Sequence, residues 1–486
     1  MSGEPFSLGV ERQGIEFVSA SHRYGTPRRL FTVWFGVNLS ILCLTVGTLG
    51  VADGLSLAWT WTALALGNCI GTAFMAAHSA QGPQLGIPQM IQSRAQFGVL
   101  GAGLPLLAVL ASTTLYSSAN AILISDTIRL IIPVSGTQAI VLFGALTVVI
   151  AFIGYELIHR LAAVLTVLSG ALFIGVTVLL LVSPQSAQAV ANPTGGHFSA
   201  AIFILVVTQA TAWSLSSGPT VADYSRYLPE TVSPAATFWY TGSGNFLGSL
   251  LMMMLGAYLA ATFPYLAAHA GLGIAELFGA GRYVAAILVI MNLLQVNVMN
   301  LYSAYMSSTT IITGVRGMRR VGLTYKLAVM SILMVVATII ALATQTHFDA
   351  YFSDLLSALV YVLIPWSAIN LTDYYIVRRG VYSIEHIFRI DGIYGRFRWS
   401  TIAVYLLTIL VQVPFVKLSF YTGPLARLIG ADIAWLPGLI VPGFLYWIVE
   451  RGSPAPESRL EGATDTEVQI QQAAPRSARP GARSSG

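Results

Sequence analysis

Charged residues are scarce in this chain. Asp, Glu, Lys and Arg together make up 9% of its 486 residues, whereas a soluble domain carries roughly a quarter. Hydrophobic residues make up 55% of the chain. This composition excludes a soluble globular protein and indicates a polytopic membrane protein.

Cysteines are few, and nucleotide-binding motifs are missing. Cys43 and Cys69 both lie in apolar segments, which favours packing over a disulfide, and no metal-ligand spacing surrounds them. There is no Walker-type glycine-rich loop and no histidine pair at ligand spacing. The net charge of +5 is spread over loops, unlike a nucleic-acid-binding patch. We therefore expect no cofactor, no nucleic-acid partner, no obligate protein partner and no enzymatic activity.

Acidic residues are missing from the middle of the apolar segments. Only Asp126 and Asp354 could lie within hydrocarbon, each near the outer end of a span. Arg129 follows Asp126 at the spacing of a helix-surface ion pair. Charge inside a membrane is costly and marks ion paths or proton relays. Its absence at mid-depth favours an uncharged substrate.

Apolar stretches of about 20 residues, each long enough to span a bilayer, recur along the chain. We expect twelve, beginning near Leu30, Leu57, Leu104, Ala139, Leu161, Ala200, Phe238, Val284, Lys326, Phe352, Ser400 and Ile433. With twelve spans, only four of the 25 Lys and Arg residues face away from the side of the termini: Arg129, Arg282, Lys417 and Arg427. The positive-inside rule then places both termini in the cytoplasm, and the short loops suggest a bacterial-style plasma (inner) membrane protein.

The spans divide the chain into five expected parts. They are a cytoplasmic N-terminal segment (1–27), a ten-helix transport core (28–380), a cytoplasmic loop (381–399), two C-terminal transmembrane helices (400–450) and a disordered cytoplasmic tail (451–486). The tail is rich in Pro, Ser, Ala and charge and cannot bury enough apolar surface to fold. Residues 82–98, "GPQLGIPQMIQSRAQFG", are too polar and broken to cross; they form either an interfacial loop helix or a functional hinge.

Neutral polar residues occupy the middle of several spans. Thr113, Tyr116 and Asn120 share one stripe of the third span at i, i+3 and i+7. Four amides lie within nine residues of the eighth span: Asn292, Gln295, Asn297 and Asn300. Such residues either join helices to one another or line a water-filled cavity that receives a hydrogen-bonding ligand.

Two spans carry residues that weaken helices. The sixth, "FSAAIFILVVTQATAWSLSSGPT", ends in Ser216–Thr220, and the first carries Gly36, Asn38 and Ser40. Transporters unwind spanning helices near the midplane so that backbone groups face the ligand. We expect matching breaks in these two spans; a proline kink is the alternative for the sixth. The stretch "IPWSAIN" at 364–370 indicates a gate or a further kink.

Four blocks of the sequence carry a family resemblance. They are "ERQGIEFV…HRYGTPRRLFTVWFGVNLS", "GPQLGIPQMIQSRAQFG", "DYSRYLP" and "IPWSAINLTDYYIVRRGVY". With them the chain resembles the purine–cytosine permease group within the nucleobase–cation symporter family, from about Glu11 to the last span. The resemblance implies an all-α polytopic membrane protein: a LeuT-like core of two inverted five-helix repeats plus two C-terminal helices. Members carry nucleobases or similar flat heterocycles inward with sodium or protons.

The resemblance implies substrate contacts on the third span. Tyr116 falls where relatives place an aromatic ring that stacks on the base. Thr113 falls where the cytosine carriers place a hydrogen-bonding Gln. Asn120 matches a polar substrate-contacting position in the hydantoin transporter.

The sixth and eighth spans complete the implied site. Trp213 and Ser214 lie near the residues that cover the other ring face, and Asn297 falls on an amide that reads a substrate edge. The full candidate set is Asn38, Ser40, Thr113, Tyr116, Asn120, Trp213, Ser214, Ser217, Asn297 and Asn300.

The resemblance also implies a cation site. Gly36 and Leu39 match its backbone carbonyl donors, and Asn292 matches a side-chain donor. Relatives with a clear sodium site carry hydroxyl residues where this chain has Gln295 and Val296. A valine offers no oxygen ligand, so sodium and protons both remain open as the coupling ion.

We therefore expect a symporter that imports a neutral planar nitrogen heterocycle, a purine or pyrimidine nucleobase such as cytosine, by alternating access. Carriers of hydantoin, allantoin or vitamin-like pyrimidine and pyridine rings form an alternative. A passive channel is the alternative from another class, and discontinuous first and sixth spans speak against it.

Overall fold

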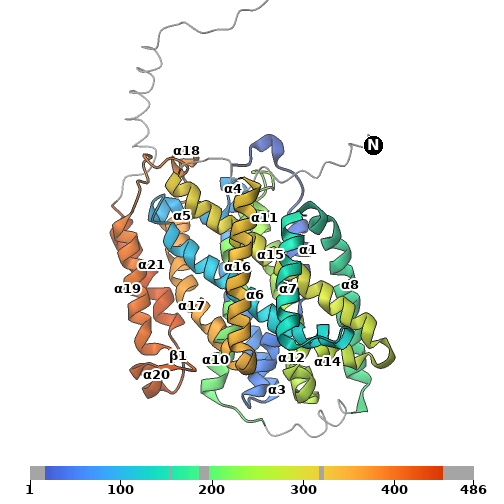
Figure 1. Ribbon diagram of the computed structural model, residues 1–486. Coiled ribbons are helices and arrows are strands. Elements are labelled where there is room, and N and C mark those ends of the chain that lie inside the picture. Colours follow the sequence, from blue (N-terminus) through green and yellow to red (C-terminus); the bar gives the residue numbers. More distant parts are fainter. Residues whose placement is uncertain (1–16, 154, 185–195, 317–321, 453–486) are drawn as a thin grey trace, which may run out of the picture.

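A computed structural model describes residues 17–153, 155–184, 196–316 and 322–452, and these residues are almost entirely helical (Figure 1). The expected tail lies outside them from residue 453 onward, as do residues 1–16 of the expected N-terminal segment. Figure 1 shows α19, α20 and α21 together at one edge of the molecule, beside α17.

The helices of the first half are α1 (Arg28–Asn38), α2 (Ile41–Ala52), α3 (Leu57–Ser79), α4 (Gly82–Leu85), α5 (Gln89–Phe97), α6 (Gly103–Ile131), α7 (Gly136–Ile153), α8 (Tyr155–Val182), α10 (Ala200–Leu215) and α11 (Gly218–Ser225). Those of the second half are α12 (Pro234–Thr262), α13 (Pro264–Ala268), α14 (Ala270–Leu277), α15 (Arg282–Arg316), α16 (Leu323–Thr344), α17 (Phe348–Thr372), α18 (Ile384–Ile387), α19 (Trp399–Gln412), α20 (Pro424–Ile429) and α21 (Trp435–Glu450). A π-helical turn, η4 (Asp373–Val377), follows α17, and β1 (Lys417–Leu418) pairs antiparallel with β2 (Tyr421–Thr422).

The first span is broken, as the sequence predicts. α1 ends at Asn38, and α2 begins at Ile41 with its axis turned by 61°. The break lies at Leu39 and Ser40 rather than at Gly36, because Ser40 caps the new helix: its Oγ accepts a hydrogen bond from the backbone N–H of Cys43 at 3.2 Å.

The sixth span is interrupted over a shorter stretch than predicted. Only Ser216 and Ser217 separate α10 from α11, and the two helices together form one span of 26 residues, Ala200–Ser225. Gly218 and Pro219 open α11, where a proline at the start of a helix loses no intrahelical hydrogen bond. The predicted irregular stretch is therefore real at its first two residues and helical at the rest.

The number of spans is a separate matter. By length and composition, six helical segments of the described chain could cross a membrane, or seven if the bent α1–α2 pair counts as one. Three shorter apolar segments, Gly136–Phe152, Trp399–Phe415 and Trp435–Glu450, add to these. The count of twelve stays a prediction.

The long helices pack in two groups. In the first group, α12 packs against α1, α2 and α3, and α3 packs against α10. In the second, α6 packs against α7, α15 and α16, and α7 against α16. Outside both groups, α21 packs against α17 and α19. α17 continues through Pro365 without ending, and the gate or kink expected at 364–370 stays a prediction.

Residues 82–98 are buried inside the protein. Every residue of α5 is buried, including Gln92 and Arg94, so other parts of the protein cover this helix. Its role as an interfacial loop helix or a functional hinge stays a prediction. The backbone N–H of Gln89, at the start of α5, donates to Asp223 Oδ1 of α11 at 2.9 Å, a favourable place for a carboxylate. Arg94 donates to the carbonyl oxygen of Thr310 on α15, and burial lowers the pKa of this guanidinium to about 10.

Candidate functional site

Two aromatic rings from different helices meet near the centre of the molecule. Tyr116 projects from α6 and Trp213 from the end of α10, directly before the break in the sixth span. Their ring centroids are 5.9 Å apart and their planes are inclined by 81°, an edge-to-face contact. The structure thus brings together the two residues that were predicted to cover the faces of a flat ligand.

Two amides meet next to Tyr116 along the chain, one from the same stripe of α6 and one from α15. Asn120, one turn further on α6, donates through Nδ2 to Asn297 Oδ1 of α15 at 3.4 Å. Asn297 in turn donates to Thr147 Oγ1 of α7 at 3.1 Å. Both amides are fully buried. The predicted third-span and eighth-span residues therefore face each other.

Three polar atoms around these residues are buried without a hydrogen-bond partner among the described residues. They are the Tyr116 hydroxyl, which lies beside Ser216 without a well-formed bond, Asn120 Oδ1 and Gln209 Oε1. A buried polar atom left unpaired costs about 1–3 kcal/mol, and such atoms are uncommon unless something else supplies a partner. Together they offer a donor and acceptors to a ligand.

Gln209 was not predicted as a site residue. It precedes Trp213 by one turn on α10, is fully buried, and donates through Nε2 to Ser353 Oγ of α17 at 2.8 Å. The i, i+4 spacing of a lone amide and an aromatic residue in an otherwise apolar helix was the signal that could have found it.

Asn38 connects the aromatic pair to the broken first span. Its Oδ1 accepts a hydrogen bond from Trp213 Nε1 at 2.7 Å. Its Nδ2 donates to the carbonyl oxygen of Trp34 at 2.7 Å and to Asn245 Oδ1 of α12 at 3.0 Å. All of its amide atoms are occupied, so Asn38 positions the tryptophan.

Ser214 points into a different polar network. It donates to Asn68 Oδ1 of α3 at 2.5 Å and accepts a hydrogen bond from Asn245 at 3.0 Å. Asn68 also accepts from Ser249 of α12 at 2.9 Å. The structure therefore places Ser214 at the contact between α3, α10 and α12, and not beside Tyr116.

Four predicted substrate residues remain: Ser40, Ser217, Thr113 and Asn300. Ser40 caps α2, and Ser217 lies in the break before α11. Thr113 donates to carbonyl oxygens of its own helix. Asn300 is half-buried, about one turn beyond Asn297 on α15.

The three residues of the predicted cation site gather at the break in the first span. Asn292 Nδ2 donates to the carbonyl oxygen of Leu39 at 2.7 Å, and the Gly36 carbonyl accepts from the Leu39 N–H at 3.1 Å. In the described ranges, no three His, Cys, Asp or Glu residues form a group that could hold a metal ion.

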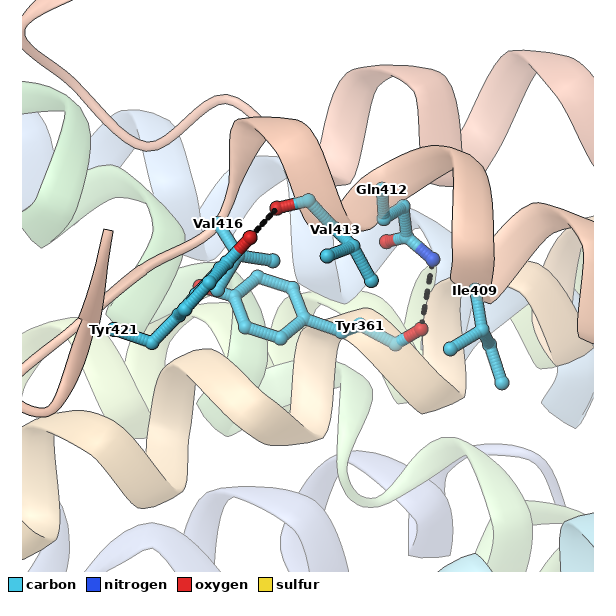
Figure 2. Close-up of a pocket in the computed structure, with 6 residues that line it drawn as sticks. All are labelled: Tyr361, Ile409, Gln412, Val413, Val416 and Tyr421. Atoms are coloured by element: carbon cyan, nitrogen blue, oxygen red, sulfur yellow. Dashed lines mark hydrogen bonds between the residues drawn. The ribbon is translucent and has the colours of Figure 1, made fainter. Parts of the chain in front are cut away.

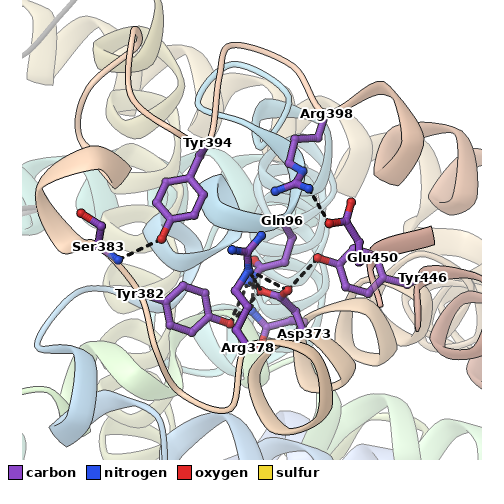
Figure 3. Close-up of polar contacts among 10 residues, drawn as sticks. Gln96, Asp373, Arg378, Tyr382, Ser383, Tyr394, Arg398, Tyr446 and Glu450 are labelled. Atoms are coloured by element: carbon purple, nitrogen blue, oxygen red, sulfur yellow. Dashed lines mark hydrogen bonds and ion pairs between the residues drawn. The ribbon is translucent and has the colours of Figure 1, made fainter. Parts of the chain in front are cut away.

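A buried carboxylate organises the end of the molecule where α5 and α18 lie (Figure 3). Asp373, in the π-helical turn after α17, pairs with Arg378 at 2.9 Å and accepts hydrogen bonds from Gln96 at 2.6 Å and from Tyr382 and Tyr446 at 2.7 Å. We call these five residues the Asp373 cluster. It joins α5, η4, the following loop and α21.

A pocket of about 310 Å³ lies apart from the residues described above, between α17 and the end of α19 (Figure 2). It is lined by Tyr361, Ile409, Gln412, Val413, Val416 and Tyr421. Gln412 donates to the Tyr361 carbonyl oxygen at 3.0 Å and Tyr421 donates to that of Val413 at 3.4 Å. Carbon atoms dominate its wall, and Gln412 Oε1 is the one atom of its lining residues that is buried without a hydrogen-bond partner among the described residues.

Known proteins resemble this chain over most of its length. YxlA of Bacillus subtilis, provisionally named a purine-cytosine permease, is 41% identical over 91% of this chain and 96% of its own. The purine-cytosine permease fcyB of Emericella nidulans is 24% identical over 90% and 88%. The inward-facing structure of Mhp1 superposes with a TM-score of 0.73 at 18% identity, covering 91% of this chain and 94% of Mhp1, which shows a common fold.

The family described as permeases for cytosine/purines, uracil, thiamine and allantoin matches residues 17–438, nearly all of the described chain. The predicted resemblance is confirmed, and so are a transporter rather than an enzyme and a multi-pass membrane setting. This chain belongs to the purine–cytosine permease group of that family.

Proposed function

We propose that this protein is a symporter that imports a neutral planar nitrogen heterocycle, a purine or pyrimidine nucleobase such as cytosine. The observation that carries the proposal is the set of orphaned atoms beside the aromatic pair: the Tyr116 hydroxyl and Asn120 Oδ1. A nucleobase edge presents alternating N–H donors and carbonyl or ring-nitrogen acceptors, which would satisfy both atoms.

The same polar atoms would allow the protein to discriminate between different rings. Amides and a hydroxyl pair with a substrate edge that matches them, and a ring with the wrong edge leaves buried groups unpaired. The aromatic surfaces of Tyr116 and Trp213 accept any flat ring. The polar atoms therefore set the choice among rings, while the aromatic pair sets the requirement for planarity.

Alternating access fits the packing of the helices. The first two spans of each proposed five-helix repeat, α1–α2 with α3 and α10–α11 with α12, make up one group. The third and fourth spans, α6 with α7 and α15 with α16, make up the other. We propose that these groups rock against each other around Tyr116 and Asn297, driven by sodium or protons, with both termini on the cytoplasmic side of the plasma membrane.

Hydantoin-like rings are the second candidate. Mhp1 has been solved with bromovinylhydantoin bound, and that structure superposes on this chain with a TM-score of 0.68 at 18% identity. A binding panel of cytosine, adenine, hypoxanthine, hydantoin and allantoin on the purified protein separates the two candidates. Ligands that bind the folded state raise its melting temperature.

Asn120→Ala and Asn297→Ala test the site. We expect each to weaken binding of the ligand found in the panel by about 1–3 kcal/mol, or roughly 5–150-fold. Ser243→Ala is the control, because its hydroxyl donates only to the Trp239 carbonyl oxygen on the exposed face of α12. Unchanged affinity in both amide variants would remove these residues from the site.

Transport kinetics separate a carrier from a channel. Uptake by reconstituted protein should saturate with substrate and follow the ion gradient. Uptake that rises linearly with substrate concentration, with no effect of Asn120→Ala, would support a passive pore instead.

A further inference from the structure

A side chain of this protein already binds the backbone oxygen that the family resemblance assigns to a cation. The Leu39 carbonyl lies in the break between α1 and α2, where backbone groups are released from helical hydrogen bonds. Its oxygen accepts a hydrogen bond from Asn292 Nδ2 of α15 at 2.7 Å. The same nitrogen donates to Ser169 Oγ of α8 at 2.9 Å.

Both N–H groups of the Asn292 amide are therefore used. Its Oδ1 faces the backbone N–H of Ile41 at 3.4 Å, in the first turn of α2. The opposite orientation of the amide would bring Oδ1 to 2.7 Å from the Leu39 carbonyl oxygen, placing two acceptors in contact. The donor side of the amide thus faces the oxygens, and its acceptor side faces the N–H of α2.

A sodium ion would need these oxygens for itself. Hard cations take several oxygen ligands and no N–H groups. Here the Leu39 carbonyl and the Ser169 hydroxyl point at an amide nitrogen, and the Gly36 carbonyl accepts from the Leu39 N–H. Asn292 is 4% exposed, so its amide fills the space between α2, α8 and α15. The residues present do not fit a bound sodium ion.

We propose that the Asn292 amide takes the place of the coupling cation at this position, so that the protein binds and carries its substrate without sodium. The amide links the broken first span to α8 and α15, which is the structural task of a cation held between these elements. The inference rests on the proposed function, because it concerns the ion that drives that transport.

The melting temperature of the purified protein in sodium chloride, compared with potassium chloride at equal ionic strength and without substrate, tests this directly. We expect no difference for the native protein, and no effect of sodium on the dissociation constant of a ligand from the panel. A sodium-specific rise in melting temperature, or binding that tightens several-fold with sodium, overturns the proposal.

Asn292→Asp tests whether sodium binds once the amide nitrogen is replaced by an oxygen. A carboxylate turned toward the Leu39 carbonyl and the Ser169 hydroxyl gathers three oxygen ligands and one negative charge. We expect this variant to gain a sodium-specific rise of a few degrees. Asn292→Ala is the matched control: it vacates the same space without adding an oxygen or a charge, leaving only the Leu39 carbonyl and the Ser169 hydroxyl, and we expect no preference for sodium.

Asn292→Ser covers the case in which the aspartate variant does not fold. It removes the amide nitrogen and leaves three oxygens around the vacated space, so sodium should stabilise it as well. Indifference to sodium in both folded variants contradicts the assigned position. Failure of every ring in the ligand panel refutes the proposed function, whereas these melting temperatures need no substrate and judge only the cation site.

Discussion

At the scale of single residues, the site combines an aromatic pair with buried polar atoms that lack partners among the described residues. Helical spacing predicted that Thr113, Tyr116 and Asn120 share one stripe, and the structure places Tyr116 and Asn120 at the contact between α6, α10 and α15. Spacing could not say which polar atoms stay unpaired, because that depends on neighbours from distant parts of the chain. Thr113 satisfies its hydroxyl within its own helix, whereas the Tyr116 hydroxyl finds no hydrogen-bond partner in the part of the chain that the structure describes.

Tyr116→Phe should therefore separate stability from function. Removing a buried hydroxyl that has no partner takes away a desolvation cost, so we expect the ligand-free protein to keep or raise its melting temperature. Ligand affinity should fall roughly 5–10-fold, the loss of about one hydrogen bond. Thermal melts without ligand and titrations with it measure the two effects.

Tyr405→Phe is the matched control for that change. The Tyr405 hydroxyl of α19 donates to the Val362 carbonyl oxygen at 3.0 Å, so its loss should lower stability by about 1 kcal/mol and leave affinity unchanged. If Tyr116→Phe behaves like Tyr405→Phe, the Tyr116 hydroxyl does not contact the ligand.

At the scale of helices, the composition predicted well where the chain departs from regular structure. It predicted less well which way individual side chains point. The first span was expected to break near Gly36, Asn38 and Ser40, and it breaks where Ser40 can cap α2. Trp213 and Ser214 were predicted together, yet consecutive helical residues differ by about 100° in direction. One therefore meets Tyr116 and the other meets Asn68. The helices that lie beside each face of α10 decide which partner each residue meets, and a single sequence does not show which helices these are.

The polar stretch at 82–98 also depends on contacts with distant segments that the sequence does not show. Its polarity left an interfacial loop helix and a functional hinge open. The sequence did not show that α5 is buried, because other segments supply partners for many of its polar groups. Asp223 accepts from the start of α5, and Asp373 accepts from Gln96. A polar segment is stable inside a protein when most of its buried groups are paired, and these two partners lie more than a hundred residues away. Gln89 Oε1 and Arg94 Nε stay without a partner among the described residues.

Close contact between α2 and α12 gives a prediction at this scale. A Cβ added to Gly47 would lie 1.8 Å from the backbone oxygen of Met253. A backbone atom cannot rotate aside, so Gly47→Ala must separate the two helices at the middle of α2. Overpacking costs about 1–3 kcal/mol and occasionally more, and we expect the upper end, seen as a lowered melting temperature and yield in detergent.

Gly103→Ala supplies the comparison. It lies at the start of α6, where an added Cβ meets nothing within 4 Å, so the melting temperature should hold or rise slightly. Equal stability of the two variants would show that α2 and α12 do not pack this closely.

At the scale of the whole molecule, a buried charge helps to tie the C-terminal helices to the rest. Asp373 is fully buried and binds Gln96 of α5 and Tyr446 of α21, besides its ion pair with Arg378. Asp373 follows the apolar stretch that begins near Phe352, and no pattern in the sequence predicted that its carboxylate would be buried. Removing one partner of a buried ion pair costs about 3–5 kcal/mol, because the other charge is left uncompensated.

Asp373→Asn should therefore destabilise the protein by several kcal/mol, while Asp391→Asn, which breaks an exposed pair with Arg389, should change little. Adding Arg378→Met to Asp373→Asn removes the orphaned guanidinium and should restore much of the loss, because buried pairs are often replaceable as a unit. Melting temperatures of the two single variants and the double variant give the coupling between the residues. Additive losses would mean that the two charges act independently, and the C-terminal helices would then be attached mainly by the apolar contact of α21 with α17 and α19.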